Sequence, residues 1–452
     1  MNILKKIEKP LLASFFVVFF LCSLFDRSFI GLYIIGFRLG ELIVGFLFLI
    51  TILFALLNKN LIRKLNLESF TYTLRTYKII IITFAISLIY FQTSLTSTYT
   101  YKTSSYIWMS SLVFLSYYLF TKTYTSNKYL SLVIYIYALL PIIHYLFSSG
   151  YYPDFIMSFF MDHSDKFNFT KASDIMIVSV IASLVLFNTE KNKQVPFIYF
   201  AAVVPLLLPL LLEMSRGSFV GAAIFYILVM GFNWRYLFSI PRFTIILILI
   251  SASTFIFSTY RISGIEFNAS QKQEVVVMDT SLAGGIKKIA KKNDTRKAFF
   301  SFYIEDGRLV SDDNTTDWRL DIWQDVIEDL NKKDSVISGY GYNEIIPVMT
   351  DPTAPGRLGR DGLNENVHSY IFNILARGGI VQLFLFITFH LSFVLIWYKK
   401  YKNFDILLLM VPVFINSATD MNMEGVQFPF MYYFFLGIYF KLYKNDLNNS
   451  SI

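Results

Sequence analysis

One stretch, from Asn364 to Gly379, organises this chain and reads Asn-Glu-Asn-Val-His-Ser-Tyr-Ile-Phe-Asn-Ile-Leu-Ala-Arg-Gly-Gly. It connects a long polar segment to an apolar run that ends near Tyr398. A helix from Val367 to Tyr398 would be about 48 Å long, whereas the hydrocarbon core of a bilayer is roughly 30 Å thick. The whole of this helix therefore cannot lie in lipid.

A bend is the simplest way to fit such a helix to a membrane. We predict that Ile380–Tyr398 spans the bilayer and that Val367–Arg377 stands above it or lies along its surface. The pair Gly378–Gly379 permits the bend, because glycine adopts backbone conformations that other residues avoid. This arrangement places His368, which we expect on the helix, and Arg377 at the water boundary.

The composition is that of a polytopic membrane protein. Of 452 residues, 55% are hydrophobic and only 16% are charged. The net charge of +8 does not indicate a nucleic-acid partner, because the basic residues are scattered at the ends of apolar segments. Cys22 is the only cysteine, which excludes an intramolecular disulfide and a thiolate metal cluster. We find no metal-ligand spacing and predict no metal and no cofactor.

Apolar runs bounded by polar residues recur along the chain and predict an all-α polytopic membrane protein with about twelve transmembrane helices. The runs lie at residues 11–25, 39–57, 79–92, 106–120, 129–147, 172–188, 196–212, 219–232, 241–259, 380–398, 404–418 and 427–440. We divide the chain into N-terminal transmembrane helices (1–195), a core (196–440) that includes a long loop (260–366), and a tail (441–452).

The distribution of lysine and arginine predicts the orientation. Basic residues are more frequent in the short connections that share a side with the N-terminus, so the positive-inside rule places both termini in the cytoplasm. Arg216, the loop 260–366 and the connection 420–427 then lie on the outer face. The loop is long enough to form a lobe, and Asp317–Leu330 within it has the apolar periodicity of a helix.

Four candidate functional groups share that outer side: Ser215-Arg216, Arg319, His368 and Arg377. An arginine at a membrane boundary is costly to keep dry, so its partner is expected to be an anion. Two guanidinium forks suit the oxygens of a diphosphate on a lipid headgroup. The imidazole of His368 would then serve as the base that deprotonates an incoming hydroxyl.

Simpler roles remain open for several of these residues. Arg216 could only snorkel or cap a helix, and Arg319 could pair with a loop carboxylate such as Asp321 or Asp325. Trp323 suits an interface anchor better than a sugar-stacking platform.

The last predicted outer connection carries two carboxylates, Asp420 and Glu424. They are candidates for binding an acceptor substrate. A solvated loop explains them equally well at the level of the sequence.

The order of these motifs resembles the O-antigen ligase and O-antigen polymerase superfamily. The resemblance covers roughly residues 196–439 and rests on Ser215-Arg216-Gly217, Arg319-Leu-Asp-Ile-Trp323, Gly339-Tyr-Gly341, Asn366-Val-His368-Ser369 and Arg377-Gly-Gly379. The ligase pattern is matched at His368, Ser369 and Gly379, and this sequence departs from it at Gln382.

The resemblance implies a metal-independent C-type glycosyltransferase on the outer (periplasmic) face of the bacterial inner membrane. The donor would be a glycan on undecaprenyl diphosphate, with Arg216 and Arg319 on the diphosphate and His368 on the acceptor hydroxyl. Arg377, Trp323 and Ser215 would support the site. Ligases use lipid A-core as the acceptor and polymerases use a second lipid-linked repeat unit, and both remain open.

Two other classes of function are compatible with the sequence. A flippase or transporter of lipid-linked glycans would use the many spans and would need a charged cavity at the bilayer midplane. A non-catalytic protein would use the loop 260–366 to bind a partner in a polysaccharide export complex.

Overall fold

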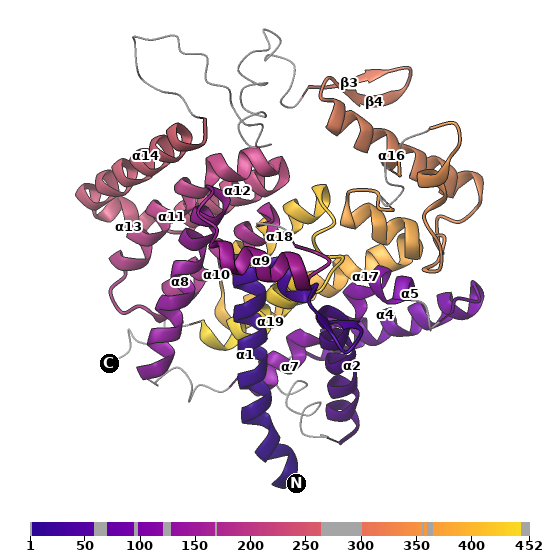
Figure 1. Cartoon of the computed structure of the whole chain (residues 1–452), viewed down its shortest axis with the longest axis horizontal. Coiled ribbons are helices and arrows are strands. Elements are labelled where there is room, and N and C mark those ends of the chain that lie inside the picture. The colour runs from indigo at the N-terminus through magenta and orange to yellow at the C-terminus, as the bar shows by residue number, and fades with distance from the viewer. Residues whose placement is uncertain are drawn as a thin grey trace.

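The computed structural model describes residues 2–57, 70–94, 98–120, 128–167, 170–263, 301–354, 357–358 and 365–443. Its described part is a helical bundle with two antiparallel hairpins of two strands each (Figure 1). The prediction of an all-α protein omitted both hairpins. Asn364, residues 264–300 of the predicted loop and residues 444–452 of the predicted tail lie outside the described residues.

Each of the twelve predicted apolar runs falls on helical structure, although the run 106–120 is divided between two short helices. The corresponding helices are α1 (Asn2–Ile30), α2 (Leu39–Leu57), α4 (Thr71–Tyr90), α6 (Ser105–Ser110) with α7 (Leu112–Leu119), α8 (Lys128–Ser148), α10 (Ala172–Thr189), α11 (Gln194–Met214), α12 (Arg216–Phe232), α14 (Pro241–Ser263), α17 (Tyr370–Tyr401), α18 (Leu407–Thr419) and α19 (Gln427–Leu442). The shorter helices α5 (Thr98–Thr103), α9 (Asp154–His163) and α13 (Trp234–Ser239) connect them.

Six of the described helices are long and apolar enough to cross a membrane, judged by length and composition. They cover Glu8–Ile30, Thr71–Tyr90, Ala172–Thr189, Gln194–Met214, Pro241–Ile262 and Tyr370–Tyr401. Three further apolar helices have 10–17 residues. The chain is thus a multi-pass, mostly helical membrane protein, and the figure of about twelve spans stays a prediction.

Helix α19 forms the centre of the bundle. It is apolar on every side and buried along its length, as expected of a helix with no solvent-facing stripe. It packs against α1, α7 and α10. A Cβ atom at Gly437 would lie 2.0 Å from the Ser116 hydroxyl oxygen and 2.4 Å from the Val113 carbonyl oxygen, so only glycine permits this close approach to α7.

The predicted bend in α17 is confirmed. Gly379 has φ 66° and ψ −172° within the helix, a conformation that breaks its hydrogen-bond ladder. Backbone from the preceding segment repairs the break, because the amides of Tyr340 and Gly341 donate to the carbonyls of Ala376 and Arg377 at 2.8 and 2.9 Å. The Gly339-Tyr340-Gly341 motif therefore completes a broken helix.

The polar segment before α17 folds into a small lobe that lies beside α17 at the edge of the bundle (Figure 1). It contains strands β3 (Phe302–Glu305) and β4 (Arg308–Ser311), helix α16 (Asn314–Lys332) and the 3₁₀ turn η2 (Pro347–Thr350). Helix α16 confirms the helical periodicity of Asp317–Leu330. Its residues Ile322, Val326 and Leu330 are buried against Ile346 and Val367, whereas Ile327 is exposed.

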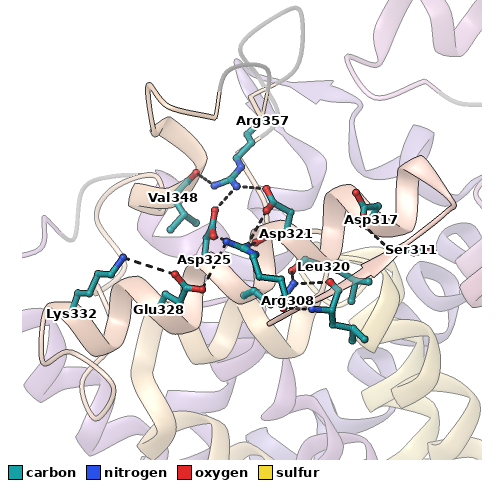
Figure 2. A network of polar contacts seen from close by, with 12 residues as sticks. Arg308, Ser311, Asp317, Leu320, Asp321, Asp325, Glu328, Lys332, Val348 and Arg357 are labelled. Carbon is teal, nitrogen blue, oxygen red and sulfur yellow. Dashed lines mark hydrogen bonds and ion pairs between the residues drawn. The ribbon is translucent and has the colours of Figure 1, made fainter. Parts of the chain in front are cut away.

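Two arginines neutralise the acidic face of α16 (Figure 2). Arg308 from β4 forms ion pairs of 3.0 and 2.7 Å with Asp321 and Asp325. Arg357 bonds to the same two carboxylates and donates to the Val348 carbonyl at 2.9 Å. These carboxylates are therefore occupied in holding the hairpin and the later loop to α16.

Candidate functional site

Three of the predicted motifs meet at the C-terminal end of α18. This helix ends at Thr419, and Asp420 adopts an extended conformation that starts the connection to α19. Helix α18 packs against α12 and α17 and so lies between elements that are far apart in the sequence. We refer to Thr419 and Asp420 as the α18 terminus.

The Ser215-Arg216-Gly217 motif packs directly on the α18 terminus. Ser215 caps α12, and its hydroxyl accepts from the Ser218 amide at 3.5 Å. A Cβ atom at Gly217 would lie 1.9 Å from the hydroxyl oxygen of Thr419. Asn416 of α18 also donates to the Ser218 hydroxyl at 2.6 Å. Glycine is thus required here because the start of α12 touches the end of α18.

Arg319 reaches the same point from the lobe. Its Nη1 donates to the Thr419 carbonyl oxygen at 2.9 Å, while its Nε has no hydrogen-bond partner among the described residues. Burial lowers the pKa of Arg319, and the charge of Arg216 lowers it further, whereas Asp420 and Asp313 raise it. Arg308 and Arg357 pair with Asp321 and Asp325, so the loop carboxylate that acts on Arg319 is Asp313.

His368 lies just before α17, so its predicted place on the helix is wrong. Ser369 is the N-cap of α17, and its hydroxyl accepts from the Phe372 amide at 3.4 Å. His368 has φ 52°, a left-handed conformation that residues other than glycine adopt rarely. The amide of Tyr370 donates to the Asp420 carbonyl at 3.2 Å, which ties this turn to the α18 terminus.

The environment of His368 favours the neutral imidazole. Burial lowers its pKa to about 4, the positive charges of Arg319 and Lys171 act in the same direction, and Asp420 opposes them. The ring also packs against Trp318 of α16, with ring centroids 4.9 Å apart. At neutral pH the imidazole is therefore in the form that accepts a proton.

Arg216 and two carboxylates complete the charges around the α18 terminus. Arg216 Nη1 lies 2.6 Å from Asp313 Oδ2, and the Arg216 side chain is 42% exposed. Asp313 is also the N-cap of α16 and accepts from the Thr316 amide at 3.0 Å. Asp420 forms an ion pair of 3.1 Å with Lys171, which precedes α10. Sequence reasoning missed both Lys171 and Asp313.

Trp323 fixes the backbone next to His368. Its indole Nε1 donates to the Val367 carbonyl at 2.7 Å, and its ring stacks on Phe372 with centroids 5.0 Å apart and planes 5° apart. The indole thus joins α16 to the start of α17.

Arg377 is not brought to the α18 terminus. It lies two helical turns after Tyr370, about 10 Å along α17, and its side chain is buried. Its guanidinium donates to the carbonyls of Gly341 and Glu344 and to the Tyr99 hydroxyl. Its described contacts hold the segment that repairs the kink.

The candidate site therefore combines Arg216, Arg319, His368 and Lys171 with Asp313 and Asp420. Among the residues that the structure describes, no group of three or more His, Cys, Asp or Glu side chains is placed to hold a metal ion. The arrangement offers clustered cations for an anionic ligand and a neutral imidazole beside them.

Comparison with known proteins agrees with the motifs. No curated protein matches the chain. A family model described as O-antigen ligase matches residues 200–387, about two fifths of the chain. The matched range includes Arg216, Arg319 and His368, and it ends before Asp420. This confirms the resemblance over residues 200–387, the part of the chain that is similar to the O-antigen ligase family.

Proposed function

We propose that this protein transfers a glycan from a polyprenyl diphosphate lipid to an acceptor hydroxyl. The observation that carries the proposal is the convergence of Arg216, Arg319 and His368, from three separate parts of the chain, on the α18 terminus. The family match supports a transfer reaction of the ligase or polymerase type.

The two arginines suit the diphosphate of the donor. The charge of Arg216 raises the cost of keeping Arg319 charged, so an anion between the two guanidinium groups would relieve this repulsion. Arg319 Nε has no hydrogen-bond partner in the described part of the chain, and Arg216 is exposed enough to reach a ligand. Planar guanidinium groups bind phosphate oxygens in pairs, which orients the leaving group as well as attracting it.

The reaction needs one proton transfer and one displacement. A ring nitrogen of His368 takes the proton of the acceptor hydroxyl, and the hydroxyl oxygen forms a bond to the anomeric carbon of the donor sugar. The bond from that carbon to the diphosphate oxygen breaks, and the polyprenyl diphosphate leaves with the electron pair. The arginines stabilise the charge that develops on it.

Binding of the donor also changes the pKa of His368, the proposed base. A pKa of about 4 makes the imidazole of the free protein a weak base. A bound diphosphate beside Arg319 would offset the positive charges that lower this pKa and would raise it toward the working pH. Donor binding and acceptor activation are therefore coupled.

Placement in the cell follows from the same proposal. We place the α18 terminus on the periplasmic face of the bacterial inner membrane, with undecaprenyl diphosphate as the carrier and both termini in the cytoplasm. The support is the excess of lysine and arginine in the connections that would face the cytoplasm. The acceptor is lipid A-core for a ligase or a second lipid-linked unit for a polymerase, and the reaction requires no metal.

The purified protein, supplied with a lipid-diphosphate glycan and an acceptor, tests this function. His368→Ala is expected to lower turnover by ~10²- to 10⁴-fold, because it removes a positioned base. The control is His163→Ala, which changes an exposed histidine at the end of α9. Unchanged turnover in the His368 variant would remove the proposed base.

Two further assays separate the alternatives. Cells that lack the protein would retain full-length polymer on its lipid carrier if the protein is a ligase, and would accumulate single repeat units if it is a polymerase. Reconstituted vesicles test the flippase alternative, which the family match does not support. Glycan movement without a new glycosidic bond would favour that alternative.

A further inference from the structure

A second polar cluster lies next to the α18 terminus. Glu424, in the connection between α18 and α19, has a side chain that is only 2% exposed. Lys102 of α5 lies 3.6 Å from its carboxylate and 3.4 Å from that of Glu365. The Lys102 and Glu365 side chains are 47% and 26% exposed, so the cluster reaches from the protein interior to the surface. A solvated loop does not explain Glu424.

Several buried polar atoms of this cluster have no hydrogen-bond partner among the described residues. They are Oε2 of Glu424, Oδ1 of Asn373 and Nε of Arg377, whereas Oε1 of Glu424 is paired with Lys102. Buried polar atoms normally find partners, so these three atoms are open to hydrogen bonds with a ligand.

Two of these groups form a stripe with Tyr370 on one helix. Tyr370, Asn373 and Arg377 are spaced at i, i+3 and i+7, which places them on one face of α17. The stripe begins two residues after His368 and extends about 10 Å along the helix. Lys102 links Glu424 to this stripe, because Lys102 and Arg377 both lie over the ring of Tyr99, at 5.9 and 5.1 Å from its centroid.

The charges of the cluster point to a neutral ligand. Lys102 and Arg377 balance Glu365 and Glu424, whereas the α18 terminus has more cations than carboxylates. The open groups include acceptors on Glu424 and Asn373 and a donor on Arg377. A ligand that both donates and accepts hydrogen bonds without net charge has the properties of a saccharide.

We propose that Glu424 and the stripe of Tyr370, Asn373 and Arg377 bind the acceptor saccharide, with the Glu424 carboxylate accepting hydrogen bonds from its ring hydroxyls. This inference rests on the proposed function. The reacting hydroxyl lies at His368, and the remainder of the saccharide extends along α17 toward Arg377. Arg377, remote from the proposed diphosphate site, thereby contacts the acceptor.

The protonation state of Glu424 follows from its neighbours. Burial raises its pKa, Lys102 and Arg377 lower it, and Glu365 raises it. Tyr99 and Tyr370 are the other titratable groups that face it. Lys102 therefore helps to keep the carboxylate ionised, the form that accepts hydrogen bonds most strongly.

Direct binding tests this inference without requiring turnover. The probe is an oligosaccharide released from the surface glycan of cells that produce the protein, titrated into the purified full-length chain without donor. Glu424→Gln is expected to weaken binding by about tenfold or more, because it removes a charged acceptor of hydrogen bonds. Glu305→Gln, an exposed carboxylate on β3, is the matched control and should bind as the wild type does.

A second variant covers the case in which Glu424→Gln does not fold. Lys102 is half exposed, so Lys102→Gln is expected to fold normally. Its loss raises the pKa of Glu424, so the pH below which saccharide binding weakens should move upward. Absence of saccharide binding by the wild type, or equal affinity and pH dependence in all variants, would overturn the acceptor site.

The kinetics of glycan transfer distinguish a failure of the acceptor site from a failure of the proposed function. In the donor-dependent assay, Glu424→Gln should raise the KM for the acceptor and leave the KM for the donor unchanged. A wild type that binds saccharide but forms no new glycosidic bond contradicts the proposed function and leaves the saccharide site standing. Comparison of a free repeat unit with deacylated lipid A-core as probes distinguishes the two acceptor classes.

Discussion

Arg319 and Thr419 are 100 residues apart in sequence and are joined by a hydrogen bond of 2.9 Å from the guanidinium Nη1 to the carbonyl oxygen. This bond holds the lobe against the end of α18. Because α12 and the turn before α17 contact the same helix end, its position determines how the predicted catalytic groups are arranged.

Gly217→Ala tests the contact between α12 and the α18 terminus. The new Cβ atom would lie 1.9 Å from the Thr419 hydroxyl oxygen, so the helices must separate, and we expect a loss of about 1–3 kcal/mol of unfolding free energy. Transfer should fall as well, because Arg216 moves with α12. Thermal unfolding in detergent and the transfer assay measure both effects.

The control is Gly231→Ala in the same helix, where an added Cβ meets nothing within 4 Å. Adding Thr419→Ala to the Gly217 variant removes the clashing hydroxyl and should restore part of the stability. Equal stability of both alanine variants would contradict the contact.

Asp313→Asn tests whether Asp313 competes with the donor for Arg216. The substitution removes the charge that pairs with Arg216 at 2.6 Å, while asparagine remains a good N-cap for α16. We expect a KM for the donor that is several-fold lower, with little change in stability. Steady-state kinetics over a range of donor concentrations measure this.

Asp313→Ala is the informative comparison, because it removes the cap as well as the charge. It should lower the stability of the lobe by about 1 kcal/mol. A donor KM that rises in the asparagine variant would show that Asp313 assists binding instead of competing with it.

His368 makes stability depend on pH. Burial and the charges of Arg319 and Lys171 lower its pKa from 6.5 to about 4, so between these values the unfolded chain binds more protons than the folded one. This contribution, about 3 kcal/mol, is fully present above pH 6.5 and is lost as the pH falls toward 4. His368→Gln should flatten the dependence of unfolding free energy on pH over this range. Parallel curves for the two proteins would contradict the assigned environment.

Arg377→Lys tests whether Arg377 stabilises the fold or binds the donor. Lysine cannot reach the Gly341 and Glu344 carbonyls and the Tyr99 hydroxyl together, so we expect a loss of about 1–3 kcal/mol in stability and an unchanged donor KM. Arg216→Lys should do the opposite and raise the donor KM with little effect on stability. Chemical denaturation and donor titration distinguish the two results.

Local sequence patterns predicted the helices better than they predicted the contacts between them. The period of Asp317–Leu330 gave α16, and two adjacent glycines gave the kink at Gly379. The hairpin of β3 and β4 was missed although Asp306 and Gly307 both have positive φ, the pattern of a tight Asp-Gly turn. Ser369 before the apolar run was likewise an N-cap signal that would have placed His368 outside α17.

The rest of the site depends on contacts that no local pattern contains. Nothing in the sequence distinguishes Thr419 from other residues near a helix end. Its role follows from its contacts with Gly217 and Arg319 in the structure. Lys171 and Asp313 similarly gain a role from partners in other parts of the chain. Such pairings are decided by packing between helices, whereas periodicity reports only which face of each helix is apolar.

The repair of α17 by Tyr340 and Gly341 has a consequence for engineering. Because these two amides take the place of missing helical bonds, the segment around them is part of the span that it adjoins. Chimeras that exchange this region between related chains should therefore transplant residues 336–341 and 370–380 as one unit, since a graft of either piece alone would leave the helix with unpaired backbone groups around Gly379, in its N-terminal third.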